Sequence, residues 1–183
     1  GKCLNAGQTC VAPDYVMVPR HRLDEFTSTF RDVVSTWYPT VRDNADFTSV
    51  INARQLKRLQ GYLQDAENKG AKIVPINPAK EDFEGSGKLP MTLVLDTTDD
   101  MLIEQDEIFG PLLIVRAYDT LDQAIKHVND RPRPLALYYF DYDAGRADYL
   151  LNHTHSGGVC VNDTLTHVAL DDLPFGGVGP SGM

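Results

Sequence analysis

The sequence predicts an α/β fold, a layered domain in which helices flank a mostly parallel sheet. Short apolar segments alternate along the chain with segments of helical periodicity. The apolar segments are continuous rather than alternating with polar residues, as is typical of strands buried on both faces. Such an order of strands and helices favours a sheet covered by helices on both sides.

The first elements are a strand at residues 15–19 and a helix that follows it. One face of that helix carries Leu23, Phe26, Phe30, Val33, Val34 and Trp37 at steps of one, three and four residues. A second helix begins after Asn52, a favourable N-cap residue. Its apolar side carries Ala53, Leu56, Leu59, Leu63 and Ala66.

The remaining elements continue the alternation. Strands are expected at residues 72–75 and 92–95, separated by a loop rich in proline, glycine and charge, and a third at 112–116. Thr120 and Gln123 form a capping box that opens another helix. Strands at 135–140 and 159–161, with a helix over 143–151 between them, complete a chain whose short loops predict one compact body.

The composition is that of an ordinary globular protein. Of 183 residues, 42% are hydrophobic and 23% charged, and the formal net charge of −9 disfavours nucleic acid or an anionic membrane as a partner. No apolar run approaches the length of a membrane span, and no signal-peptide pattern is present. Three cysteines without paired spacing fit reduced thiols in the cytoplasm better than a disulfide framework or a zinc site.

The segment Gly7-Gln8-Thr9-Cys10 is the most informative feature of the chain. It presents one cysteine between small polar residues and a proline-interrupted strand. A thiolate attacks a carbonyl carbon best where backbone N–H groups of a turn can receive the oxyanion. Because free cysteine is among the most buried residue types, a packed structural thiol is the alternative to a nucleophile.

A second motif, Glu107-Ile-Phe109-Gly110-Pro111, lies directly before a strand. Gly-Pro enforces a turn there and leaves the carboxylate and the aromatic ring projecting from a loop. The alternative to a binding role is an exposed loop acid beside a core phenylalanine.

Two other patterns resemble ligand-binding motifs, but we do not interpret them as binding sites. Residues 177–182 match G-x-G-x-x-G, but Pro180 leaves no helix of a βαβ unit to receive a phosphate, so Gly176 and Gly177 are expected to serve backbone conformation. His153, His155 and His167 are close in sequence, yet no cysteine or carboxylate completes a ligand spacing, so we expect surface or loop histidines and no metal.

Three stretches, taken together and in this order, resemble the signatures of the aldehyde dehydrogenase superfamily. They are Gly-Gln-Thr-Cys10, Glu107-Ile-Phe-Gly-Pro111 and Leu173-Pro-Phe175-Gly-Gly177-Val-Gly-Pro-Ser181-Gly182. Cys10-Val-Ala-Pro-Asp-Tyr15 and Phe175-Gly-Gly-Val-Gly179 resemble in particular the class 3 branch, which includes fatty-aldehyde and coniferyl aldehyde dehydrogenases. The resemblance spans nearly the whole chain and implies the catalytic-domain fold of that family.

The resemblance also implies roles. Cys10 would be the nucleophile that oxidises an aldehyde to a carboxylic acid through a thiohemiacetal and a thioester. Glu107 would hydrogen-bond hydroxyls of the nicotinamide ribose of NAD or NADP, and Phe109 would pack near the nicotinamide ring. The substrate would be an aromatic aldehyde such as coniferyl aldehyde or a medium- or long-chain aliphatic one, and the full-length enzyme would be a homodimer.

In that family a general-base glutamate, an oxyanion-binding asparagine and the cofactor-binding domain precede the cysteine motif. Residues 1–183 are therefore expected to be the cysteine-bearing catalytic domain of a longer chain, without the cofactor-binding domain and the C-terminal tail, and inactive in isolation. Two other functions stay open. One is a thiol hydrolase or acyltransferase that pairs Cys10 with His155 or His167, and the other is a non-catalytic interaction domain that retains the fold.

Overall fold

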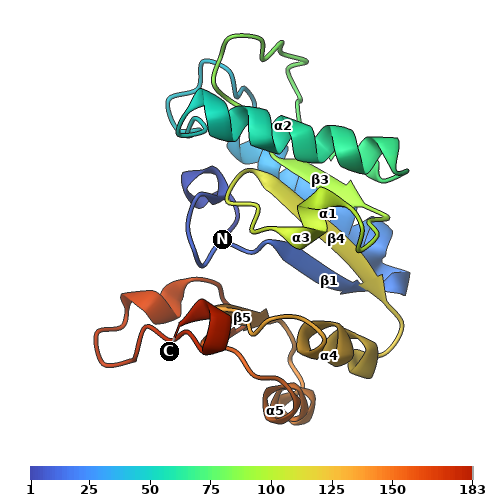
Figure 1. Cartoon of the computed structure of the whole chain (residues 1–183), viewed down its shortest axis with the longest axis vertical. Helices are drawn as coiled ribbons and strands as arrows, with labels where there is room; N and C mark the ends of the chain where they lie inside the picture. The colour runs from blue at the N-terminus through green and yellow to red at the C-terminus, as the bar shows by residue number, and fades with distance from the viewer. Residues whose placement is uncertain (183) are drawn as a thin grey trace. The chain divides into compact units, whose positions relative to one another are not determined.

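The computed structural model describes residues 1–182 and divides the chain into two compact units (Figure 1). Residues Lys2–Ala117 form the N-terminal unit, and the chain from Tyr118 onward, together with Gly1, forms the C-terminal unit. The sequence predicted a single compact body. The division depends on which segments contact each other in space, and no change of composition near residue 117 announces it.

The N-terminal unit is built on one four-stranded sheet in the order β1-β4-β3-β2. Strand β3 runs parallel to β4, and β2 runs antiparallel to β3. Its strands are β1 (Tyr15–Pro19), β2 (Lys72–Pro75), β3 (Thr92–Leu95) and β4 (Leu112–Tyr118), and its helices are η1 (Leu4–Gly7), η2 (Arg20–Arg22), α1 (Leu23–Trp37), α2 (Ala53–Asn68) and α3 (Leu102–Gln105).

Helices α1 and α2 cover opposite faces of this sheet, as Figure 1 shows. Because side chains alternate between the faces of a strand, Leu93 and Leu95 of β3 pack with α1 while Val94 packs with α2. In β4, Leu113 packs toward α1 and Leu112 toward α2. The continuous apolar runs of the sequence thus fill two hydrophobic layers.

Helix starts follow the predicted caps. The Asn52 side chain accepts a hydrogen bond from the Gln55 N–H at 3.0 Å at the start of α2. Thr120 does the same for the Gln123 N–H at 3.3 Å at the start of α4. The Gln123 side chain, however, accepts from the N–H of Asp119 rather than of Thr120, so the reciprocal bond of the capping box is displaced by one residue.

The C-terminal unit holds a second, two-stranded sheet in which β5 and β6 run parallel, with Tyr138 opposite Cys160. Its elements are α4 (Leu121–Asn129), β5 (Ala136–Tyr139), α5 (Ala144–His153), β6 (Gly158–Val161), η3 (Thr166–Ala169) and η4 (Gly179–Ser181). Among the helices of residues 1–182, none combines the length and hydrophobicity that a transmembrane span requires.

The α/β class with helices flanking mostly parallel strands is confirmed, with differences of detail. The strands lie in two sheets, one of which gains the antiparallel neighbour β2. Strand β4 extends two residues beyond the predicted 112–116, and the single-turn helix α3 was not predicted. The short helix has only four residues, too few to show a periodicity.

Candidate active site

Cys10 lies in an exposed turn at the start of the N-terminal unit. The turn is closed by the Ala12 N–H, which donates to the carbonyl of Thr9 at 3.1 Å. Just before it, Asn5, Ala6 and Gly7 adopt positive φ angles of 50°, 52° and 72°. Left-handed backbone costs energy for residues with a Cβ, and it persists only where surrounding contacts impose it.

Gln8 supplies those contacts. Its side-chain amide donates to the carbonyls of Asn5 and Ser49, each at 3.0 Å, and its side-chain oxygen accepts from the Ile51 N–H at 2.9 Å. The Asn5 side-chain amide in turn donates to the Gln8 carbonyl at 3.2 Å. The glutamine two residues before the nucleophile therefore anchors the Cys10 turn to the segment before α2.

The loop with Glu107 and Phe109 follows α3 and leads into β4. Phe109 has a φ of 47° and an exposed ring, and Glu107 is exposed as well. Arg58 of α2 clamps this loop by donating to the carbonyls of Glu107 at 3.2 Å and of Ile108 at 2.6 Å. From the other side, the Asp14 carboxylate accepts from the Ile108 N–H at 3.1 Å. The strained turn is thus held on both sides while both predicted ligand-binding side chains face solvent.

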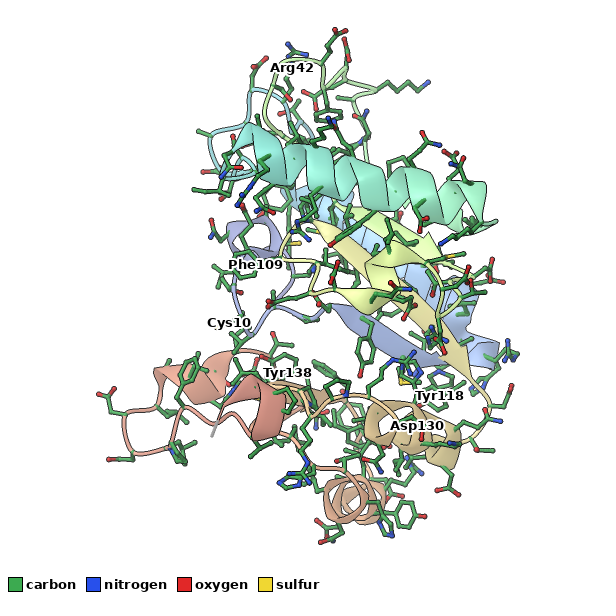
Figure 2. The ribbon with its side chains drawn as sticks, viewed as in Figure 1. Cys10, Arg42, Phe109, Tyr118, Asp130 and Tyr138 are labelled. Atoms are coloured by element: carbon green, nitrogen blue, oxygen red, sulfur yellow. The ribbon has the colours of Figure 1, made fainter. Side chains whose placement is uncertain are left out.

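The two loops touch. A Cβ built on Gly7 would lie 2.3 Å from the carbonyl oxygen of Gly110, so only a residue without a side chain permits this approach. Figure 2 shows Cys10 and Phe109 on these neighbouring loops of the N-terminal unit. The structure therefore brings together all three residues predicted from the sequence, Cys10, Glu107 and Phe109, within one unit.

Buried charge lies beneath the two loops. The Lys2 ammonium is 3.7 Å from the Asp14 carboxylate, with the Lys2 side chain 3% exposed. Burial lowers the pKa of Lys2 to about 8 against the opposing effect of Asp14. Burial raises the pKa of Asp14, and desolvation followed by the charge of Asp14 raises the pKa of Glu107.

These residues fit a nicotinamide cofactor. The Glu107 carboxylate makes no hydrogen bond within residues 1–182, so it is available to accept from hydroxyl groups, as the ribose contact requires. The exposed Phe109 ring, two residues away, offers an apolar surface to a flat ring.

Sequence reasoning missed Lys2, Asp14 and Arg58. The signal for Asp14 was present, because it lies within the segment Cys10-Val-Ala-Pro-Asp-Tyr15 that resembles the class 3 branch. Arg58 gave no such signal, since a helical arginine 49 residues from Glu107 looks like an ordinary surface residue.

The glycine-rich C-terminal segment behaves as predicted. Gly176 and Gly177 both have φ of +96°, and a Cβ on Gly177 would lie 2.6 Å from the carbonyl oxygen of Ser181. Only the three-residue turn η4 follows, so the G-x-G-x-x-G match opens no phosphate-binding helix. The conformational role of these glycines is confirmed.

His167 is buried in η3, whereas a surface or loop histidine was expected. It is 5% exposed in η3, and its Nδ1 lies 3.2 Å from the Cys160 Sγ. Cys160 is buried as well, so the two side chains contact each other inside the unit. His153 is exposed, and its Nδ1 contacts the carbonyl of Tyr149 at 2.7 Å. Within residues 1–182, no three potential ligands from His, Cys, Asp and Glu gather as a metal site would require.

All three cysteines are free. Cys10 is exposed, Cys3 is half-buried and Cys160 is buried. Burial raises the pKa of the Cys3 thiol. The N-terminal unit thus carries the exposed Cys10 turn and, on a loop in contact with it, the exposed Glu107 carboxylate and Phe109 ring.

The family model "Aldehyde dehydrogenase family" matches residues 1–183, and the chain belongs to this family. It is 58% identical to a "Probable coniferyl aldehyde dehydrogenase" of Pseudomonas aeruginosa, over the whole of this chain and 38% of that protein.

The chain is also similar in three-dimensional structure to two solved proteins. The substrate-bound state of Staphylococcus aureus AldH has a TM-score of 0.89 at 36% identity and is matched over all of this chain and 39% of that one. An aldehyde dehydrogenase C variant from Pseudomonas syringae, in complex with NAD⁺ and octanal, has a TM-score of 0.77 at 27% identity, with 90% of this chain and 34% of that one covered. The chain thus spans well under half the length of these relatives.

Proposed function

We propose that this chain is the cysteine-bearing catalytic domain of an enzyme that oxidises an aldehyde to a carboxylic acid with NAD or NADP. The observation that carries the proposal is the junction of two loops, one with an exposed cysteine and the other with an exposed carboxylate and an aromatic ring. Family membership supports the reaction class. Because the chain covers 38% of its relative, the activity belongs to the full-length protein.

Cys10 would act as the nucleophile. Its thiolate would add to the aldehyde carbon, and the Cys10 backbone N–H in the turn is suited to donate to the developing oxyanion. A nicotinamide cofactor, when bound, supplies the hydride acceptor for this oxidation. Water would then hydrolyse the resulting cysteine thioester, with assistance from a general base supplied by the full-length protein.

Glu107 and Phe109 would hold the cofactor. The Glu107 carboxylate would accept hydrogen bonds from the hydroxyls of the nicotinamide ribose, and the Phe109 ring would limit the motion of the nicotinamide. The clamped backbone of this loop supports the role, because a contact that positions a reacting group must itself be held in place.

We further propose an aromatic substrate such as coniferyl aldehyde, with medium- or long-chain aliphatic aldehydes as the second class. The name of the P. aeruginosa relative, probable coniferyl aldehyde dehydrogenase, supports the first class, and octanal in the P. syringae complex supports the second. We also propose that the full-length protein is a homodimer in the cytoplasm. The three free cysteines suit a reducing compartment of this kind. Light scattering of the full-length protein tests the dimer.

The experiment is an assay of the full-length protein with NAD⁺ and NADP⁺ in turn, against coniferyl aldehyde, benzaldehyde, hexanal and octanal. We expect reduced cofactor to form with at least one aldehyde, Cys10→Ser to abolish its formation, and the matched control Cys160→Ser to retain it. Cleavage of activated esters without cofactor, and no cofactor reduction by any aldehyde, would instead identify the thiol hydrolase.

A further inference from the structure

We propose that Lys2 is a positioning residue for Glu107, acting through Asp14 on the loop that presents Glu107 and Phe109. The inference rests on the proposed function, because it takes Glu107 as the residue that binds the cofactor ribose. Lys2 would not touch the cofactor or the aldehyde itself.

The first observation is the unusual state of the Lys2 ammonium. Its side chain is 3% exposed, and its Nζ makes no hydrogen bond within residues 1–182, although an ammonium has three protons to donate. Its one ion-pair partner is Asp14 at 3.7 Å. Burying a cation so poorly solvated is costly, and a buried polar group of this kind calls for a specific explanation.

The second observation is the set of contacts that connect Lys2 with the loop of Glu107 and Phe109. The second oxygen of the Asp14 carboxylate accepts from the Ile108 N–H at 3.1 Å, and Ile108 lies between Glu107 and Phe109. The Asp14 carbonyl accepts from the Ile114 N–H at 3.2 Å, which fixes Asp14 against β4. Lys2, Asp14 and the Ile108 amide therefore form a chain from the buried cation to the middle of the cofactor-binding loop.

The third observation is the electrostatic balance around Glu107. Burial and the negative charge of Asp14 raise the pKa of Glu107, while the positive charges of Lys2 and Arg58 lower it. Lys2 thereby offsets the repulsion between the Asp14 and Glu107 carboxylates. An ionised carboxylate accepts hydrogen bonds from hydroxyl groups about twice as strongly as a neutral acceptor does.

The charged and titratable groups that act on Lys2 are Asp14, Glu107 and the Cys3 thiol, all of which favour its protonated form against burial. With the pKa of Lys2 at about 8, its charge is lost as the pH rises from 7 to 9. Cofactor affinity should fall over this interval, since Glu107 and Asp14 would then face each other without the Lys2 cation.

A purely structural role for Lys2 predicts something different. Its aliphatic stem packs against Gly7, with Cε 3.0 Å from where a Gly7 Cβ would lie, so the stem alone could fill the space between the two loops. Methionine keeps an unbranched apolar stem and removes the charge. Lys2→Met therefore separates the charge from the packing, and Lys2→Arg keeps a charge that does not titrate in this range.

The test measures the Kd of NAD⁺, without aldehyde, by calorimetry on the full-length protein between pH 7 and pH 9. We expect the Kd of wild type to rise about fivefold to tenfold across this range, as loss of a nearby charge produces. Lys2→Met should bind weakly at both pH values, and Lys2→Arg should bind without this pH dependence. In a Glu107→Gln background, Lys2→Met should cause no further weakening, because its effect passes through Glu107.

Lys88→Met is the matched control. Lys88 is also buried, but its ammonium donates to the carbonyls of Val41 at 3.0 Å and Asn44 at 2.6 Å, in another part of the unit. We expect it to lower the melting temperature without changing the Kd of NAD⁺.

A pH-independent wild-type Kd would overturn the inference, and this measurement needs no variant to fold. Additive effects of Lys2→Met and Glu107→Gln would overturn it as well. If Glu107→Gln weakens NAD⁺ binding while Lys2→Met does not, the inference fails and the proposed function stands. If Glu107→Gln leaves the Kd unchanged, the cofactor role of Glu107 fails and the inference fails with it.

Discussion

Gly7 and Gly110 approach each other so closely that a Cβ on Gly7 would lie 2.3 Å from the Gly110 carbonyl oxygen. One belongs to the segment that leads into Cys10, and the other follows Phe109. This contact, which no side chain could occupy, joins the candidate nucleophile loop to the candidate cofactor loop.

Gly7→Ala should therefore separate the two loops. The added methyl group collides with backbone, and alanine disfavours the φ of +72° at this position, so we expect the free energy of unfolding to fall by about 1–3 kcal/mol. Chemical denaturation measures this loss. Gly61→Ala is the control: nothing lies within 4 Å of its Cβ in α2, and alanine should stabilise the helix by about 0.5–1 kcal/mol. Equal effects of the two changes would contradict the packing argument.

Gln8→Ala should loosen the Cys10 turn. It removes three hydrogen bonds, including those with Ser49 and Ile51, and leaves partly buried backbone groups unpaired, which costs roughly 1–3 kcal/mol. We expect a lower melting temperature and a reduced kcat of the full-length enzyme. Gln64→Ala, which removes an exposed bond to Asn68 on α2, should change neither. A normal kcat for Gln8→Ala would show that the turn does not depend on this anchor.

Cys10 should react with iodoacetamide faster than the other two thiols in the folded protein. Cys10 is exposed, whereas Cys160 is buried beside His167 and Cys3 is half-buried with a raised pKa. Because the thiolate is the reactive form, both burial and a raised pKa slow alkylation. Peptide mapping by mass spectrometry gives the three rates. Labelling of Cys3 or Cys160 at the rate of Cys10 or faster would count against an activated nucleophile.

Glu107→Gln in the full-length enzyme should raise the cofactor KM while leaving the fold intact. One charge-assisted hydrogen bond to a ribose hydroxyl contributes on the order of 1.5–3 kcal/mol, which corresponds to a rise of about 10-fold to 100-fold. Steady-state kinetics with varied NAD⁺ measures the effect, and a thermal melt verifies folding. Glu67→Gln on the exposed side of α2 is the control. A collapsed melting temperature would indicate a structural role instead.

The 183-residue chain alone should not oxidise aldehydes at a measurable rate. The resemblance to the family implies a general base and an oxyanion-binding amide outside these residues, which contribute rate factors of about 10²–10⁴ and about 10²–10³ respectively. Purified chain assayed with both cofactors and the four aldehydes tests this expectation. Cysteine-dependent turnover by the 183 residues would show that they hold a complete site.

Local sequence determined much of the fold. Strands β1, β2 and β3 occupy the predicted residues, and Asn52 caps α2 as expected, because apolar runs and capping side chains act over a few neighbouring residues. Contacts between residues far apart in the sequence could not be predicted. Asp14 and Ile108 are 94 residues apart. His167 was expected in a surface or loop position, and its buried contact with Cys160 could not be predicted because it depends on how η3 packs against β6.

In the candidate site, too, some residues could be predicted from the sequence and others could not. Cys10, Glu107 and Phe109 could be predicted because each belongs to a motif that resembles a family signature. Arg58 and Lys2 support those residues through main-chain carbonyls and buried charge, and neither contact leaves a periodicity or a motif in the sequence. Gln8 lies within the Gly-Gln-Thr-Cys motif, but its hydrogen bonds to Ser49 and Ile51 could not be predicted. The supporting residues are visible only when the backbone is in place.

The junction of the two loops has a mechanical consequence. Cys10 and Glu107 belong to one compact unit, tied together through Asp14, Ile108 and the Gly7–Gly110 contact. Because both loops belong to the same unit, a movement of either loop has to carry the other with it or break these contacts. Under the proposed function, the contacts that join the two loops would keep the Cys10 sulfur at a fixed distance from a cofactor held by Glu107.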